Sequence, residues 1–409
     1  MDPWIPSRRS TGSWVLYDLA NTVFALAVGG RYFSVWVVQE PGGSDALFGY
    51  ATALAMAIVI VLAPWVGTRS DRAGTRRPAL IVTTLATVAA TALLTIWGLY
   101  PSLALYIVGQ IGFTLGSVVY DAMLPDVSTE ANRGLVSGLG VGVGYLGSFL
   151  AIGTGLIMLD RYGYGPLFRT LALMFLFFAL PAFVFIEERP RPRQAGQPPR
   201  LIEALAHLAR SWRRARRYPG VARFLIGRFL YADGANTAFL FVAIFAVTEM
   251  GFSDRQTDLL ALSAIVSAVI GSFIVGKVVD RIGPRKALHT ALYLWSAAVV
   301  VAVVAALSDR AGLGWFVGIL GGAAAGATWT SDRVYMARIS PPEHYGEFYG
   351  LYATVGRFAT LLGPLVWALI TDTLKWGRVA AIASLLLFFG TARIVLAGVT
   401  DTPIASDAS

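Results

Sequence analysis

Runs of about twenty apolar residues recur along the chain, and they restrict its fold more than any other feature. Such a run is the length that an α-helix needs to cross the hydrocarbon core of a bilayer. Of the 409 residues, 56% are hydrophobic and 14% are charged, whereas soluble domains carry about a quarter charged residues. We therefore expect an all-α membrane protein with twelve transmembrane helices, at 13–38, 46–68, 78–98, 102–125, 135–158, 166–186, 221–248, 256–277, 287–307, 312–335, 347–371 and 377–398.

Two short motifs each occur twice. Residues 18–24 read DLANTVF and residues 233–239 read DGANTAF, an offset of 233 − 18 = 215. The pattern Gly-x-x-x-Asp-Arg-x-Gly-x-Arg runs over 67–76 and returns over 276–285, an offset of 280 − 71 = 209. Because each copy falls on the corresponding span or loop of its half, the chain is predicted to be a duplicated transporter with two pseudo-symmetric six-helix bundles.

The basic residues predict how the chain crosses the membrane. Three loops, 69–77, 188–220 and 277–286, are rich in arginine and fall on one side if the spans alternate. The positive-inside rule puts these loops and both termini in the cytoplasm, so we expect an integral, multi-pass protein of the cytoplasmic membrane. The net charge of +9 lies largely in these loops, which argues against nucleic-acid binding. The expected divisions are a bundle at 1–187, a connector at 188–220, a bundle at 221–400 and a tail at 401–409.

The connector itself divides into two parts. Its first part is rich in proline and should be an extended linker. Residues 201–217 read as a basic amphipathic helix that would lie on the cytoplasmic leaflet and contact anionic lipid. A simple solvated connector is the alternative.

The repeated loop motif, together with six plus six spans, resembles the major facilitator superfamily. The segment 14–24, WVLYDLANTVF, is similar to the opening of the vacuolar amino-acid effluxer (autophagy-related) family and its bacterial relatives. The segments 120–125 and 133–147 are similar to the region between the fourth and fifth helices of that family. Leu19 departs from the pattern, since an aromatic residue is commoner there. The resemblance implies two bundles around a central cavity, and amino-acid export by the fungal members.

Polar side chains inside apolar spans are expensive, so each one requires an explanation. Asp18 and Asn21 lie three residues apart, as do Asp233 and Asn236, so each pair shares a helix face. The functional interpretation is a substrate or proton site in the cavity. The structural alternative is an aspartate that caps an interrupted helix or pairs with an arginine. The further candidates for this site are Tyr17, Tyr231, Arg31, Arg228 and Arg357, with snorkelling or ion pairing as the alternative for the arginines.

A second set of residues is predicted to form a cytoplasmic gate. The repeated loops can bind across the bundle, and Asp121 and Asp332 form another matched pair on the fourth and tenth spans. Breaking such contacts would shift the equilibrium between inward and outward states. A solvated or topogenic loop, and a direct ligand role for the matched aspartates, are the alternatives. The expected gate residues are Gly67, Asp71, Arg72, Arg76, Asp121, Asp280, Arg281, Arg285, Asp332 and Arg333.

These features together predict a secondary active transporter that works by alternating access. The first expectation for the substrate is an amino acid or similar small zwitterion, with proton coupling through Asp18 or Asp233. Alternatives are a sugar or drug-like efflux porter, a lipid flippase or a non-transporting membrane sensor. The chain has no cysteine, no His-Glu-x-x-His, no Gly-x-Ser-x-Gly and no Walker sequence, so we expect no enzyme activity, metal or cofactor. A complete two-bundle chain is expected to work as a monomer.

Overall fold

The computed structural model describes residues 5–129, 133–189, 201–308, 310–340 and 345–399. Within these ranges the secondary structure is helical and contains no strand, which confirms the all-α fold class. The chain divides into two compact units, Met1–Leu205 and Ala206–Ser409. Along the chain, α8 (Leu201–Ala215) lies between the helices of one unit and those of the other, within the segment 201–217 where a helix was expected. The first part of the connector, 190–200, lies outside the described residues.

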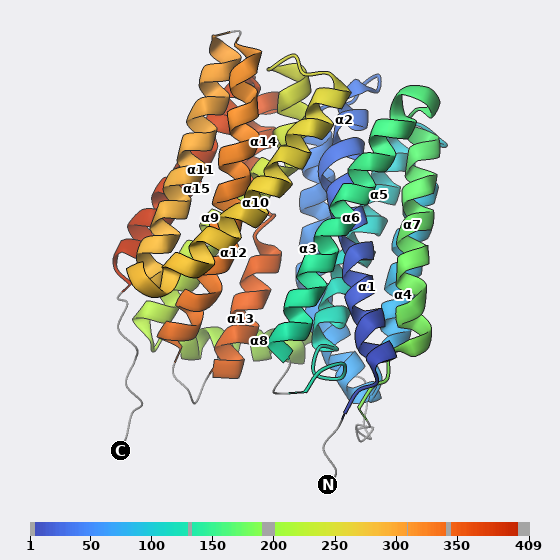
Figure 1. Cartoon of the computed structure of the whole chain (residues 1–409), viewed down its shortest axis with the longest axis vertical. Helices are drawn as coiled ribbons and strands as arrows, with labels where there is room; N and C mark the ends of the chain where they lie inside the picture. Colours follow the sequence, from blue (N-terminus) through green and yellow to red (C-terminus); the bar gives the residue numbers. More distant parts are fainter. Residues whose placement is uncertain (1–4, 130–132, 190–200, 309, 341–344, 400–409) are drawn as a thin grey trace. The chain divides into compact units, whose positions relative to one another are not determined.

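The first unit is drawn in blue to green in Figure 1. Its first span consists of three consecutive segments, because a stretch of π-helix interrupts the α-helix. A π-helical turn inserts residues into a helix and is frequent at functional sites. The elements are α1 (Arg8–Phe24), η1 (Ala25–Arg31), α2 (Tyr32–Gln39), α3 (Asp45–Ala73), α4 (Arg77–Ala92), α5 (Leu99–Ala122), α6 (Arg133–Tyr162) and α7 (Tyr164–Phe185).

The second unit repeats this order in yellow-green to red. Its fifth span is again divided, here into two α-helices and a π-helical end. The elements are α9 (Pro219–Thr248), α10 (Asp254–Ile282), α11 (Pro284–Leu307), η2 (Ala311–Leu313), α12 (Gly314–Ile339), α13 (Tyr345–Phe358), α14 (Leu362–Ala368), η4 (Leu369–Thr373) and α15 (Gly377–Ala397).

Both units pack their helices in the same pairs. In the first unit α1 contacts α6 and α7, α3 contacts α5, and α4 contacts α5 and α7. In the second unit α9 contacts α13, α14 and α15, α10 contacts α12, and α11 contacts α12 and α15. The contacting helices have the same order along the chain in both units: α1 corresponds to α9, α3 to α10, α4 to α11, α5 to α12, α6 to α13 and α14, and α7 to α15. The duplication read from the two motifs therefore extends to the packing of each half.

Nine helices in the described residues are long and apolar enough to cross a membrane. The divided first span, the shorter α4 and the glycine-rich α12 lie where three further spans are expected but fall outside those nine. Large apolar side chains remain exposed along many of these helices, including Phe177 at 68% and Ile394 at 77%. A surface of this kind is suited to lipid rather than water. The chain is thus an integral multi-pass membrane protein, and the number of twelve spans stays a prediction.

The fifth span of the second unit is broken between α13 and α14. Helical structure stops at Phe358 and resumes at Leu362, so Pro364 falls in the first turn of α14. Proline is tolerated there because the first-turn N–H groups have no partner within the helix, whereas one turn later its ring would clash with the preceding turn. The fifth span of the second unit, expected as one run over 347–371, is therefore interrupted at this point. The corresponding helix of the first unit, α6, runs unbroken over 30 residues.

Glycine allows the closest helix contacts in both units. On α6, Gly140, Gly144 and Gly147 face α1, and a Cβ at Gly147 would lie 2.4 Å from the Leu19 carbonyl oxygen. Gly142 faces open space. On α12, Gly318, Gly322 and Gly326 form a stripe with a four-residue spacing that lies against α10. Small residues at this spacing let two helix backbones approach in a membrane.

We expect Gly326→Val to destabilise the second unit by about 2 kcal/mol or more, the usual range for overpacking a tight interior. A Cβ at this position would lie 2.0 Å from the carbonyl oxygen of Ala268, a backbone atom that cannot move aside cheaply. Thermal unfolding in detergent measures the effect. Gly276→Val on α10 is the matched control, because the nearest atom to its Cβ is 3.9 Å away. Equal melting temperatures for the two variants would contradict the expectation.

Candidate functional site

In the second unit the Asp-x-x-Asn motif of α9 lies against the break in the fifth span. The carboxylate of Asp233 is fully buried and accepts hydrogen bonds from the backbone N–H groups of Leu362 at 2.9 Å and Gly363 at 3.0 Å. One turn further along α9, the Asn236 amide donates to the carbonyl oxygen of Ala359. Two side chains of one helix thus satisfy backbone groups on both sides of the interruption.

This arrangement explains why the chain can be broken inside an apolar environment. An interrupted helix leaves N–H and C=O groups without partners, and each such group is costly where water is absent. Asp233 supplies acceptors to the start of α14, while Asn236 supplies a donor to the end of α13. The motif thus matches the alternative in which the aspartate caps an interrupted helix. A Cβ at Gly363 would lie 1.7 Å from Thr237 Oγ1 and 3.0 Å from Asp233 Oδ1, so a glycine here lets α9 approach the start of α14.

The copy in the first unit makes the same helix contact without the cap. Asp18 is half-buried on α1 and lies against Gly144 of α6, where a Cβ would be 3.2 Å from Asp18 Oδ2. Because α6 is continuous there, it offers no unpaired backbone N–H groups to this carboxylate. Asn21 is 7% exposed, and its Oδ1 atom has no hydrogen-bond partner among the described residues. The two copies therefore share a position and differ in what the carboxylate binds.

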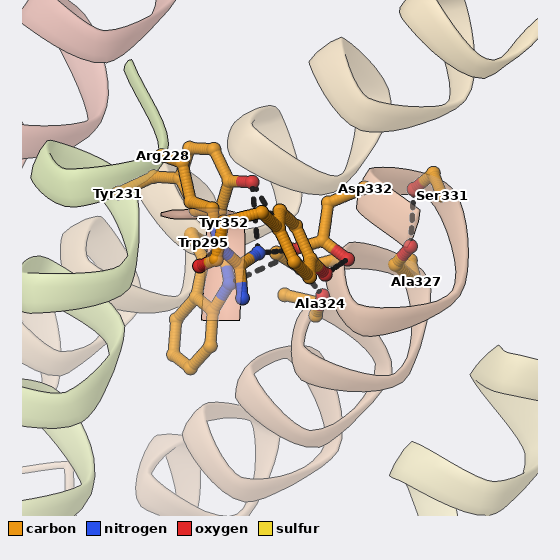
Figure 2. Close-up of polar contacts among 9 residues, drawn as sticks. Arg228, Tyr231, Trp295, Ala324, Ala327, Ser331, Asp332 and Tyr352 are labelled. Atoms are coloured by element: carbon orange, nitrogen blue, oxygen red, sulfur yellow. Dashed lines mark hydrogen bonds and ion pairs between the residues drawn. The ribbon is translucent and has the colours of Figure 1, made fainter. Parts of the chain in front are cut away.

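A buried ion pair lies one to two turns before Asp233 on α9. Figure 2 shows Arg228 and Tyr231 of α9 converging with Tyr352 of α13 on Asp332 of α12. The Arg228 guanidinium donates to Asp332 Oδ2, which also accepts from the Tyr231 hydroxyl at 3.1 Å. The Tyr352 hydroxyl donates to Oδ1 at 2.9 Å. Both carboxylate oxygens of Asp332 are thereby occupied.

The arginine of this pair is held as tightly as the aspartate. Its guanidinium carbon lies 3.5 Å from the ring centroid of Tyr352, and Nε donates to the backbone oxygen of the same residue at 3.3 Å. A Cβ at Gly356 would lie 2.6 Å from Nη2, so glycine leaves the space that the guanidinium fills. The Arg228 and Asp332 side chains are 8% and 0% exposed. Loss of one partner from a buried pair of this kind leaves an uncompensated buried charge, which costs about 3–5 kcal/mol.

The structure brings together some of the expected site residues and separates others. Arg228, Tyr231 and Asp332 meet in one cluster, although Asp332 was expected at the gate. Tyr17 lies 1% exposed inside the first unit, where its hydroxyl is 2.6 Å from Thr84 Oγ1. Arg31 is 2% exposed at the end of η1, with its guanidinium 4.9 Å from the ring of Tyr32. Arg357 is half-buried in the last turn of α13.

Several expected gate residues can be placed, but not as one network. The surroundings of Gly67 and the side chains of Asp71, Arg72 and Asp280 lie outside what the structure describes. Arg281 and Arg333 are exposed, and Arg285 donates to the Ala397 carbonyl oxygen at 2.6 Å. The gate therefore stays a prediction.

At the other repeated loop, Arg76 pairs with a residue that the sequence interpretation missed. Its Nη1 atom lies 3.5 Å from Asp126 Oδ2, a fully buried carboxylate, whereas the expected Asp121 is exposed. Glu188 accepts from the backbone N–H groups of Arg76 and Arg77, at the start of α4. Two features of the sequence could have indicated these contacts. Glu187 and Glu188 form an acidic pair directly after the sixth span, and Asp126 follows Pro125 at the end of the fourth span.

Comparison with known proteins gives this geometry a context. The family described as "Vacuole effluxer Atg22 like" matches residues 43–402. An uncharacterised MFS-type transporter, YxiO of Bacillus subtilis, is 28% identical over 96% of this chain and 95% of its own length. Autophagy-related protein 22-1 of Aspergillus fumigatus is 23% identical over 60% of this chain; the match spans 44% of that longer protein.

Solved structures with the same fold support the same classification. The nucleoside transporter NupG has a TM-score of 0.70 at 13% identity, and covers 95% of this chain and 98% of its own. The D-xylose-proton symporter also scores 0.70, at 14% identity, with 97% and 98% covered. At these identities the likeness shows the fold, which is that of the major facilitator superfamily. With the family match over most of its length, the chain belongs to the Atg22-like vacuole effluxer family and is a transporter of the major facilitator type.

Proposed function

We propose that this transporter moves a small zwitterion, with an amino acid as the first candidate, by alternating access. The observation that carries the proposal is the buried Arg228–Asp332 pair with its two tyrosine hydroxyls. A zwitterion presents one carboxylate and one ammonium group, so it can take the place of each partner in turn. The net charge of the site stays the same during the exchange, which avoids leaving an unpaired charge in a buried place.

The same cluster offers a route for proton coupling. Protonation of Asp332 would remove the charge that holds Arg228 and would leave the guanidinium for a substrate carboxylate. We therefore assign the coupling to Asp332 in preference to Asp233, because two backbone N–H groups already hold the Asp233 carboxylate. Asp18 remains the second candidate, since its carboxylate is half-buried and lies beside an unbroken helix.

The membrane setting is part of the proposal. The arginine-rich loops favour an orientation with both termini in the cytoplasm. We infer that the chain lies in the cytoplasmic membrane and works as a monomer. On α8, Ser211 and Ala215 are buried, whereas Arg210, Arg213 and Arg214 are exposed. This distribution suits a helix whose arginines meet the anionic headgroups of the cytoplasmic leaflet.

Transport into proteoliposomes tests the proposed function. Purified protein is first screened by thermal shift against the twenty amino acids, a panel of sugars and a panel of nucleosides. Each solute that raises the melting temperature is then assayed for uptake with and without an inward proton gradient. Stabilisation and gradient-driven uptake of at least one amino acid are expected. Uptake of sugars or nucleosides alone would overturn the proposed substrate class. An uptake rate that is the same with and without the proton gradient would overturn the proposed coupling.

A further inference from the structure

One arginine on the exposed apolar surface of the second unit forms no ion pair within the part of the chain that the structure describes. Arg393 of α15 is half-buried; it donates from Nη2 to the Tyr293 hydroxyl of α11, and its guanidinium carbon lies 3.9 Å from the centroid of that ring. Its Nε atom is buried without a hydrogen-bond partner. Among the described residues no carboxylate forms an ion pair with it. A cation in this position is expensive unless an anion reaches it.

The surroundings of Arg393 have the composition of a surface that contacts lipid. On α11, Tyr293 is 55% exposed, and the same helix face continues through Val300 at 48%, Val304 at 46% and Leu307 at 74%. The neighbour of Arg393 on α15, Ile394, is 77% exposed. Residues spaced by three, four and seven positions share one face of a helix. An apolar stripe of this kind accommodates acyl chains and ends at the arginine.

The depth of Arg393 matches the headgroup region. It precedes the last residue of α15, Ala397, by four positions, which is about 6 Å along a helix. The first turn of α11 lies beside this helix end, since Arg285 donates to the Ala397 carbonyl oxygen at 2.6 Å, and Lys286 next to it is exposed. Three cationic side chains thus lie near one membrane interface, beside an apolar stripe.

We propose that the exposed surface of α11 and α15 around Arg393 binds an anionic phospholipid, whose phosphate pairs with the guanidinium of Arg393. While one N–H group of Arg393 Nη2 is held by the Tyr293 hydroxyl, the other N–H groups of its two Nη atoms pair with the phosphate, which guanidinium groups bind well. Lys286 meets the negative headgroup from the water side. The acyl chains lie along the exposed stripe of α11. This site is independent of the Arg228–Asp332 pair and of the substrate.

Lipid binding to the purified full chain tests the proposal. Native mass spectrometry counts bound lipid after titration with phosphatidylglycerol or phosphatidylcholine of equal chain length, and inorganic phosphate forms a third arm. Wild-type protein is expected to retain phosphatidylglycerol in preference to phosphatidylcholine. It is expected to retain no inorganic phosphate. Arg393→Gln should weaken phosphatidylglycerol binding about five-fold, the effect of one cationic side chain at a membrane surface.

Two further variants keep the test decisive. Arg310→Gln, an exposed arginine beyond the opposite end of α11, should bind phosphatidylglycerol like the wild type. Arg393→Lys keeps the charge and should retain most of the binding, which also covers the case in which the glutamine variant does not fold. Unchanged phosphatidylglycerol binding in Arg393→Gln, equal retention of phosphatidylcholine, or equal binding of inorganic phosphate would each overturn the proposal.

Discussion

Asp332→Asn is expected to reduce the initial rate of substrate uptake into proteoliposomes at least tenfold. The carboxylate holds Arg228, Tyr231 and Tyr352, and a hydrogen bond to a charged group contributes about 1.5–3 kcal/mol, where about 1.4 kcal/mol is a factor of ten. The variant also leaves the Arg228 guanidinium buried without its counter-charge, which costs about 3–5 kcal/mol of stability. The melting temperature must therefore be measured beside the uptake rate.

A double variant separates these two effects. Arg228→Gln with Asp332→Asn removes both charges, so it should recover most of the melting temperature that the single variant loses. It should not recover transport if the pair binds the substrate. Asp372→Asn serves as the control, because this aspartate is exposed on η4. Wild-type uptake in the double variant would show that the pair has a structural role only.

Asp233→Ala is expected to destabilise the second unit by about 3 kcal/mol, because the N–H groups of Leu362 and Gly363 lose the carboxylate that accepts from them in a buried place. Asp233→Asn keeps one acceptor oxygen and should cost about half as much. The loss should be local as well as global. Amide hydrogen exchange at Leu362 and Gly363 should therefore accelerate before exchange in the centre of α9 does.

The matched control for this prediction is the other copy of the motif. Asp18→Ala removes the equivalent carboxylate from α1, which faces the continuous α6, so it should destabilise the first unit much less. A comparable drop in melting temperature for the two alanine variants would contradict the capping role of Asp233. If Asp18→Ala lowers the rate of uptake while its melting temperature stays close to that of the wild type, the Asp18 carboxylate has a functional role.

The fold was largely predictable from the sequence, because the apolar runs of about twenty residues, the charge of the loops and the duplicated motifs all indicate one architecture. The span boundaries agree with the observed helices to within a few residues in most cases, such as 166–186 against Tyr164–Phe185. The fifth span of the second unit was expected as one run over 347–371, whereas the structure breaks it between α13 and α14. Gly363-Pro364 shows where a helix is weak, but the length of the interruption depends on Asp233 and Asn236, which come from another helix.

The candidate site was harder to predict, since it depends on contacts between helices. Arg228 and Tyr231 share a face of α9, and the sequence indicates this much. Their partner Asp332 lies 104 residues after Arg228, and the spacing alone could not choose between a site at the loop and one inside the bundle. Asp126 was missed for a similar reason. It follows the fourth span at the loop, and only the fold shows that it is buried beside Arg76.

The break in the fifth span of the second unit also makes the two halves mechanically unequal. In the first half the fifth span is a single rod of 30 residues, about 45 Å long, which resists bending along its whole length. In the second half the same span consists of two short helices linked by the three residues 359–361. Two side chains of α9 hydrogen-bond to the backbone at the two ends of this linker. Bending of this half is therefore expected at residues 359–361, and the Asp233 and Asn236 side chains determine how easily the two helices change their angle there.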